Sequence, residues 1–201
     1  FDGIFDGKNH TISNLTSTET AQKGDGYICT GLFGAIYGEA VIKNLTIKNA
    51  TINTGNFTGA NVGVLVGFAY TATGSIENVN IVGDIKIDAT NAYAAGAIVG
   101  YVYYGDLEIK GCVVDANEGS YIVADSEVGG IVGENFGGTV ENCHNTSYVG
   151  GVGSNVGGIV GKIVSVDGEL ITFETGEDRV RMQVTKWAVS TIGKDTEADK
   201  K

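Results

Sequence analysis

The sequence predicts an all-β protein, a right-handed parallel β-helix (a solenoid) with one coil for about every 33 residues. Three observations lead to this prediction. A glycine phrase returns at a fixed interval, a second apolar phrase returns between its copies, and residues 1–156 show no helical period in their apolar side chains. One such unit cannot bury its apolar face alone, whereas stacked units place equivalent Ile, Val and Leu side chains in one continuous core.

The glycine phrase sets the length of the repeat. Its copies read GLFG, GVLVG, GAIVG, GGIVG and again GGIVG, and they close on Gly34, Gly67, Gly100, Gly133 and Gly161. The intervals between these glycines are 33, 33, 33 and 28 residues. Glycine at a fixed point of every coil indicates a place where the chain bends tightly or where neighbouring backbone approaches closely.

The second phrase supplies a further strand to each repeat. It reads ISNL, IKNL, IENV, IKGC and VENC, and begins at Ile12, Ile42, Ile76, Ile109 and Val140. Its third position is Asn in all copies except IKGC, where it is Gly111. Asn in this column has two structural interpretations, an amide ladder between coils or a left-handed turn residue, and the sequence leaves both open.

Composition excludes several classes of protein. The 201 residues carry a formal net charge of −11, which argues against nucleic-acid binding through a basic surface. No apolar run approaches the roughly 18 residues that a membrane-spanning helix needs. The chain begins with Phe1 and its single Met is internal, so we interpret it as a fragment. We therefore expect no nucleic-acid partner and no membrane span in this fragment.

The three cysteines do not form a disulfide framework. Cys112 and Cys143 occupy the same position in successive copies of the second phrase, and should face the core on adjacent coils. They can form a small apolar stack or, with suitable geometry, a disulfide. We favour two reduced, buried thiols.

The opening FDGIFDGKNHTISNL, followed by GLFG and IKNLTI, resembles the GLUG-repeat proteins of bacterial surfaces and secretions. The resemblance covers residues 1 to about 161 and extends to the N-terminal stalks of IgA-protease-like peptidases. It implies a right-handed β-helix that is extracellular or on the cell surface and acts as an adhesin or a rigid spacer.

The repeat pattern stops at Gly161. Both Arg residues, the Met and the Trp fall in the last stretch, which contains no Asn. Alternating apolar positions in KIVSVD, ELITFET and RVRMQVTK predict a small antiparallel β-meander within 162–193, and 194–201 read as a disordered charged tail. The predicted organisation is a solenoid at 1–161 followed by this meander.

The meander has two interpretations. Residues 157–192 resemble the soluble domain of YajC, an accessory subunit of the bacterial Sec translocase, and this resemblance implies a Sec link through the tail only. YajC proteins carry an N-terminal membrane helix, which this chain lacks. The other interpretation is a polar cap on the open end of the solenoid.

The best local candidate for binding is a group of tyrosines, namely Tyr70, Tyr93, Tyr101, Tyr103 and Tyr104. Tyrosines exposed on stacked strands form a flat aromatic platform suited to a glycan or to a protein surface, and the other interpretation is partial burial under loops. The residues give no catalytic set, metal site or cofactor motif, since His10 and His144 stand apart from any spaced carboxylate or Cys.

These observations predict a non-enzymatic, adhesin-like or spacer solenoid of a bacterial surface or secretion, whose partner is a glycan or a surface protein. Two other functions stay open. One is the non-catalytic stalk of a larger peptidase or a carbohydrate-active β-helix enzyme, and the other is a Sec-associated protein.

Overall fold

The computed structural model describes residues 1–18, 28–55 and 57–151, with the strands at 155–156, 162–167, 170–175 and 180–185. Every regular element among these residues is a β-strand. The chain divides into two compact units, Phe1–Gly158 and Ile159–Lys201. The first unit holds the glycine phrases that close on Gly34, Gly67, Gly100 and Gly133, and the second holds the strands that follow Gly161.

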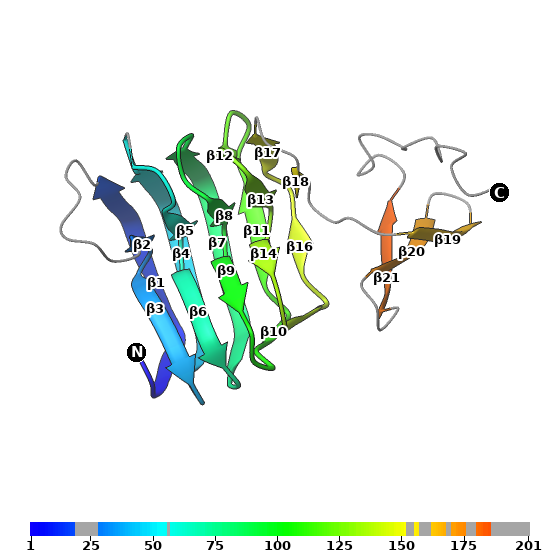
Figure 1. Cartoon of the computed structure of the whole chain (residues 1–201), viewed down its shortest axis with the longest axis horizontal. Coiled ribbons are helices and arrows are strands. Elements are labelled where there is room, and N and C mark those ends of the chain that lie inside the picture. The colour runs from blue at the N-terminus through cyan, green and yellow to red at the C-terminus, as the bar shows by residue number, and fades with distance from the viewer. Residues whose placement is uncertain are drawn as a thin grey trace, which may run out of the picture. The chain divides into compact units, whose positions relative to one another are not determined.

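Three parallel sheets run along the first unit (Figure 1). The nine-stranded sheet contains β1 (Ile4–Thr18), β4 (Val41–Asn53), β7 (Ser75–Ala89), β10 (Glu108–Lys110), β11 (Val113–Ala116), β12 (Tyr121–Ala124), β15 (Thr139–Glu141), β16 (His144–Asn145) and β17 (Tyr148–Gly151). The five-stranded sheet contains β2 (Cys29–Thr30), β5 (Asn61–Gly63), β8 (Ala94–Gly96), β13 (Glu127–Gly129) and β18 (Asn155–Val156). The four-stranded sheet contains β3 (Phe33–Gly38), β6 (Val66–Ala72), β9 (Val99–Tyr103) and β14 (Val132–Asn135).

The register of the four-stranded sheet confirms the predicted solenoid. Phe33 pairs with Val66, Val66 with Val99, and Val99 with Val132, so that this sheet repeats every 33 residues. The strands are parallel and form about four coils. The constant interval arises because each coil meets its neighbour through equivalent residues, so an insertion would disturb two interfaces at once.

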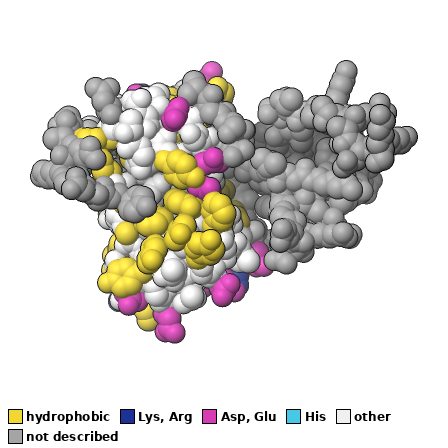
Figure 2. Space-filling view, viewed as in Figure 1, with side chains coloured by type: hydrophobic (Ala, Val, Ile, Leu, Met, Phe, Trp, Pro, Cys, Tyr) yellow, Lys and Arg dark blue, Asp and Glu magenta, His cyan; other side chains and the backbone are white. Residues whose placement is uncertain are grey.

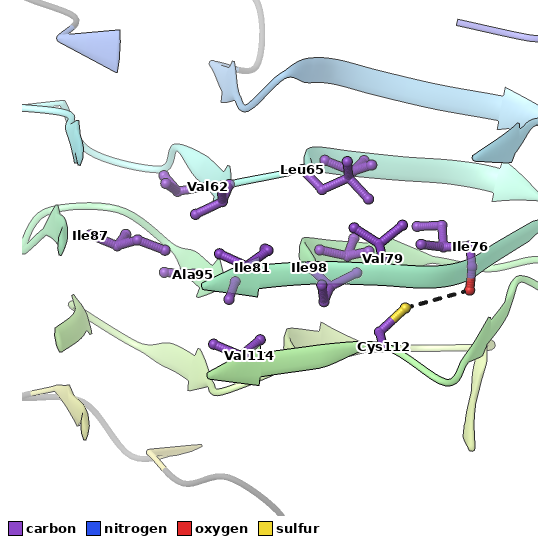
Figure 3. Close-up of a cluster of buried hydrophobic side chains, with 14 of the residues drawn as sticks. Val62, Leu65, Ile76, Val79, Ile81, Ile87, Ala95, Ile98, Cys112 and Val114 are labelled. Atoms are coloured by element: carbon purple, nitrogen blue, oxygen red, sulfur yellow. Dashed lines mark hydrogen bonds between the residues drawn. The ribbon is translucent and has the colours of Figure 1, made fainter. Parts of the chain in front are cut away.

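Columns of apolar side chains fill the interior. Ile47, Ile81 and Val114 are partners in successive coils, and the two isoleucines and the valine are fully buried. Figure 3 shows side chains of this cluster, including Ile81 and Val114, between the sheets. At roughly 1.5–3 kcal/mol for each fully buried side chain of this kind, these columns supply the main stabilisation of the stack.

The repeated glycines allow backbone to approach backbone. A Cβ added to Gly100 would lie 2.5 Å from the Val62 amide nitrogen and 2.6 Å from the Gly67 carbonyl oxygen. Gly67 and Gly133 face backbone atoms at comparably short distances. Of the two roles expected for these glycines, the structure therefore supports close approach.

The Asn column adopts the left-handed conformation. Asn44, Asn78 and Asn142 have φ of 55°, 52° and 53°, and Gly111 has φ of 61°. Asn tolerates this region better than most residues because its short polar side chain can form local hydrogen bonds. An amide contact between coils also occurs, since Asn49 Nδ2 donates to Asn14 Oδ1 at 3.1 Å.

The structure corrects the alignment of the first ISNL phrase. The recurring phrase aligns Ile12 with Ile42, but in the structure Ile12 pairs with Ile47, and Phe5 is the partner of Ile42. Asn14 accordingly lies beside Asn49 instead of Asn44. The register shifts between Asp6 and His10, where β1 contains extra residues. The short first interval arises because the phrase that begins at Ile12 is paired with the residues from Ile47 onward, and not with the phrase that begins at Ile42.

The second unit contains the predicted antiparallel meander. Its strands are β19 (Lys162–Asp167), β20 (Leu170–Thr175) and β21 (Val180–Thr185). β20 pairs with β19 on one side and with β21 on the other, both antiparallel. The predicted charged tail at 194–201 lies outside the described residues.

Candidate binding surface

Alternation along two neighbouring strands turns aromatic rings outward. Ala69 and Val102 are fully buried, whereas Tyr70 and Tyr103, the next residues along, are exposed. Successive side chains of a strand point to opposite faces, so burying Ala69 and Val102 places the residues on either side of them outside. The same pleat that fills the core therefore builds an aromatic outer face on the four-stranded sheet.

The structure brings all five predicted tyrosines into one network of ring contacts. Tyr70 and Tyr103 are stacked, with centroids 5.8 Å apart and planes 8° from parallel. Tyr101 contacts Tyr103 at 5.7 Å and Tyr93 at 5.8 Å. Tyr104 meets Tyr103 edge to face at 4.6 Å. Their exposure is unequal, because Tyr101 is half-buried and the other four are exposed.

Two further rings belong to this network and were missed from the sequence. Phe68 contacts Tyr70, Tyr101 and Tyr103, and Phe136 contacts Tyr101 and Tyr104. We call the seven residues the aromatic surface: Phe68, Tyr70, Tyr93, Tyr101, Tyr103, Tyr104 and Phe136. Figure 2 shows hydrophobic side chains gathered over β3, β6 and β9, with Asp or Glu at their border.

A sequence signal for Phe136 existed in the repeat itself. Positions 37, 70, 103 and 136 are separated by 33 residues and are Tyr, Tyr, Tyr and Phe. The backbone register joins Tyr37 to Tyr70 and Tyr70 to Tyr103, and Tyr37 is half exposed. Searching the repeat column by column would thus have extended the predicted tyrosine group in both directions.

One acidic side chain lies among these rings. Glu134 pairs in register with Tyr101, and the Tyr93 hydroxyl donates a hydrogen bond to its carboxylate. Partial burial raises the pKa of the Glu134 carboxyl above its usual value, and the charge of Glu127 acts in the same direction. Burial, together with the adjacent Glu134 carboxylate, raises the pKa of the Tyr93 hydroxyl, which is therefore protonated at neutral pH.

The cysteine pair lies on adjacent coils as predicted. Cys112 is buried, Cys143 is half-buried, and both are thiols. The Cys112 amide donates to Cys143 Sγ at 3.4 Å. The Cys112 thiol hydrogen-bonds to Cys143 and, with the neighbouring amides, lowers the pKa of Cys143 to about 7. The same hydrogen bond and burial raise the pKa of Cys112.

The described residues hold neither a metal-binding cluster nor a membrane-spanning helix. Within the described residues, no group of three or more His, Cys, Asp or Glu side chains is placed to hold a metal ion. Over the same part of the chain, no helix has the length and apolar character to cross a membrane. His10 and His144 lie on β1 and β16, and both are exposed.

Comparison with known proteins supports the surface-repeat resemblance in part. A family model described as the GLUG motif matches residues 124–150. The chain is similar to halomucin of Haloquadratum walsbyi (strain DSM 16790 / HBSQ001), with 33% identity over 100 residues. That alignment covers 50% of this chain but only 1% of halomucin. No solved structure matches significantly. The chain therefore contains a GLUG motif, while its likenesses to peptidase stalks and to YajC stay predictions.

Proposed function

We propose that this chain is part of a non-enzymatic, surface-exposed or secreted β-solenoid that binds a partner through its aromatic surface. The proposal takes up the adhesin-like role expected from the sequence. The observation that carries it is the aromatic surface itself, seven rings joined in one network of contacts on and beside the outer face of the four-stranded sheet. Extracellular display is supported by the GLUG motif at 124–150.

The exposure of these rings argues against a purely structural role for them, because exposed rings contribute little to the core. Tyr104 and Phe136 are each 55% exposed, and Tyr70 is 51% exposed, although these rings sit on a stack whose core is already filled by aliphatic side chains. Contiguous apolar patches on a protein surface commonly mark interaction sites. Tyrosine suits this task because its ring supplies contact area and its hydroxyl can bond to polar groups at the edge.

A glycan is the partner that we propose for this surface. Sugar rings present C–H faces that pack on aromatic rings and hydroxyls that bond to tyrosine hydroxyls and carboxylates. The stacked pair Tyr70 and Tyr103 offers neighbouring rings in nearly the same orientation on adjacent coils. An extended saccharide could therefore contact several coils at once, and the rigid stack would hold these contacts at a fixed spacing.

The test is binding to a glycan array with matched variants. Tyr70→Thr with Tyr103→Thr removes the stacked pair and keeps residues that favour strands. Tyr148→Thr is the control, because Tyr148 is also highly exposed but lies on β17 in the nine-stranded sheet. We expect glycan binding by the parent chain and the control, and its loss in the double variant. Absence of binding to any glycan, or equal binding by the double variant, would overturn the glycan proposal.

A further inference from the structure

Four rings of the aromatic surface form a closed circuit. Tyr101 contacts Tyr103 at 5.7 Å, Tyr103 contacts Tyr104 at 4.6 Å, Tyr104 contacts Phe136 at 6.3 Å, and Phe136 contacts Tyr101 at 6.2 Å. The planes of consecutive rings are inclined by 76°, 79°, 41° and 60°. The four rings are therefore not a flat platform, and we call them the four-ring cluster.

The backbone at Tyr104 is strained in a way that builds this cluster. Tyr104 has φ of 51°, a region that bulky residues rarely occupy. Thr71, 33 residues earlier, has φ of 48°, and Gly38, at the end of β3, has φ of 61°. The left-handed turn thus recurs along the stack, and at Tyr104 it carries a ring that contacts Tyr103 and Phe136. Strain of this kind is a reason to look for function.

A carboxylate lies beside the cluster. Glu134 is two residues before Phe136 and pairs with Tyr101. One of its oxygens, Oε2, is buried and has no hydrogen-bond partner. Tyr93 donates to the carboxylate but brings no positive charge. The negative charge of Glu134 therefore adds to the negative potential that aromatic rings carry on their faces.

We propose that the four-ring cluster binds an organic cation of the trimethylammonium class, with Glu134 as the supporting charge. Inclined ring faces beside a carboxylate are the arrangement that recognises quaternary ammonium groups through cation–π attraction. A primary ammonium fits less well, because it is strongly hydrated and loses more solvation on the rings. The net charge of −11 favours the approach of a cation. This inference rests on the proposed binding role of the aromatic surface and names a second ligand class for part of it.

Choline is the probe, and titration calorimetry with the whole chain is the measurement. The matched ligand control is 3,3-dimethylbutan-1-ol, which has the shape of choline without its charge, and potassium chloride controls for ionic strength. We expect choline to bind and the neutral alcohol to bind much more weakly. Equal affinity for the two, or no heat with choline, would overturn the proposal.

Two variants assign the binding to the cluster. Tyr104→Gly removes a ring and relieves the backbone strain, so the fold should be kept, and choline affinity should fall about 2- to 5-fold for one exposed ring. Glu134→Gln keeps an acceptor for Tyr93 and removes the charge, so affinity should fall as well. Should Tyr104→Gly fail to fold, Phe136→Leu tests the same point with an apolar replacement. Unchanged affinity in a folded ring variant contradicts the assignment.

Two further experiments identify the source of the ammonium group and distinguish this proposal from the glycan proposal. Phosphatidylcholine vesicles that bind as choline does would assign a lipid headgroup, and vesicles that do not bind would assign a soluble or polymer-borne ammonium group. Glycan binding is measured on Glu134→Gln in parallel. Loss of choline binding with intact glycan binding supports both proposals, and choline binding without any glycan binding overturns the glycan proposal alone.

Discussion

Replacing Gly100 by Ala should damage the contact between coils. The new Cβ would lie 2.5 Å from the Val62 amide nitrogen, 2.6 Å from the Gly67 oxygen and 2.7 Å from the Val62 oxygen. Ordinary contacts of a Cβ begin near 3.4 Å, so three backbone atoms must each give way by most of an ångström. None of them is the end of a flexible side chain, so the strain cannot be relieved by a change of rotamer.

The expected change in the free energy of unfolding is the balance of two opposing contributions. Overpacking costs about 1–3 kcal/mol, and this contact with rigid backbone belongs at the top of that range. Reduced entropy of the unfolded chain returns about 0.4–1 kcal/mol when Gly becomes Ala. We expect a net loss of about 2 kcal/mol in the free energy of unfolding. For a domain of this size, that loss lowers Tm by roughly 4–8 °C.

Thermal unfolding followed by circular dichroism measures this effect, with Gly3→Ala as the control. A Cβ on Gly3 would meet only the Phe1 ring, at 3.5 and 3.6 Å, which is an ordinary contact. The control should therefore stay within about 0.5 kcal/mol of the parent chain. If Gly100→Ala melts together with Gly3→Ala, the repeated glycine does not serve close backbone approach, and the reasoning fails.

Three other predictions concern the core, the left-handed column and the cysteine pair. Ile81 is fully buried between partners on both sides, so Ile81→Ala should cost about 2–5 kcal/mol and Ile81→Val about 0.5–1.5 kcal/mol in urea unfolding; equal costs would contradict the packing described. Asn78 has φ of 52°, so Asn78→Ala should cost about 1–2 kcal/mol and Asn78→Gly much less, and a reversed order would refute the role of backbone conformation. The pKa of Cys143 is lowered to about 7, so its alkylation by iodoacetamide should accelerate as the pH rises through 7 and then level off. The buried Cys112, whose pKa is raised, should stay unmodified, and mass spectrometry showing it to react first would contradict this assignment.

Much of the candidate site followed from the sequence because a strand pleat has a fixed period of two. Apolar residues at 69 and 102 imply outward side chains at 70 and 103, and the 33-residue repeat places these on adjacent coils. The ring of Phe136 was missed because the prediction considered only tyrosines, although Phe136 continues the 33-residue column of Tyr70 and Tyr103. The role of Glu134 depends on burial and on the Tyr93 hydroxyl, which no local pattern encodes.

The alignment of the first coil could not be obtained from spacing alone. An interval in the sequence counts every residue, whereas the register of a sheet depends on which residues are paired. The two differ wherever one strand contains an unpaired residue. β1 has such an irregularity between Asp6 and His10, so that Phe5 pairs with Ile42 but Ile12 pairs with Ile47. Only the arrangement of strands in space shows which residues are left unpaired.

The sequence by itself determined the period and the parallel stack, because identical contacts between coils demand identical spacing. It also determined the antiparallel strands that follow, through their alternating apolar positions. The tertiary structure decided which residues form one surface. It turned Tyr104 into a left-handed conformation and joined its ring to Phe136 from the next coil. It also set unequal pKa values for two equivalent thiols, since Cys112 is buried deeper than Cys143 and donates to it. These features depend on burial and on contacts between coils, which exist only once the chain is stacked.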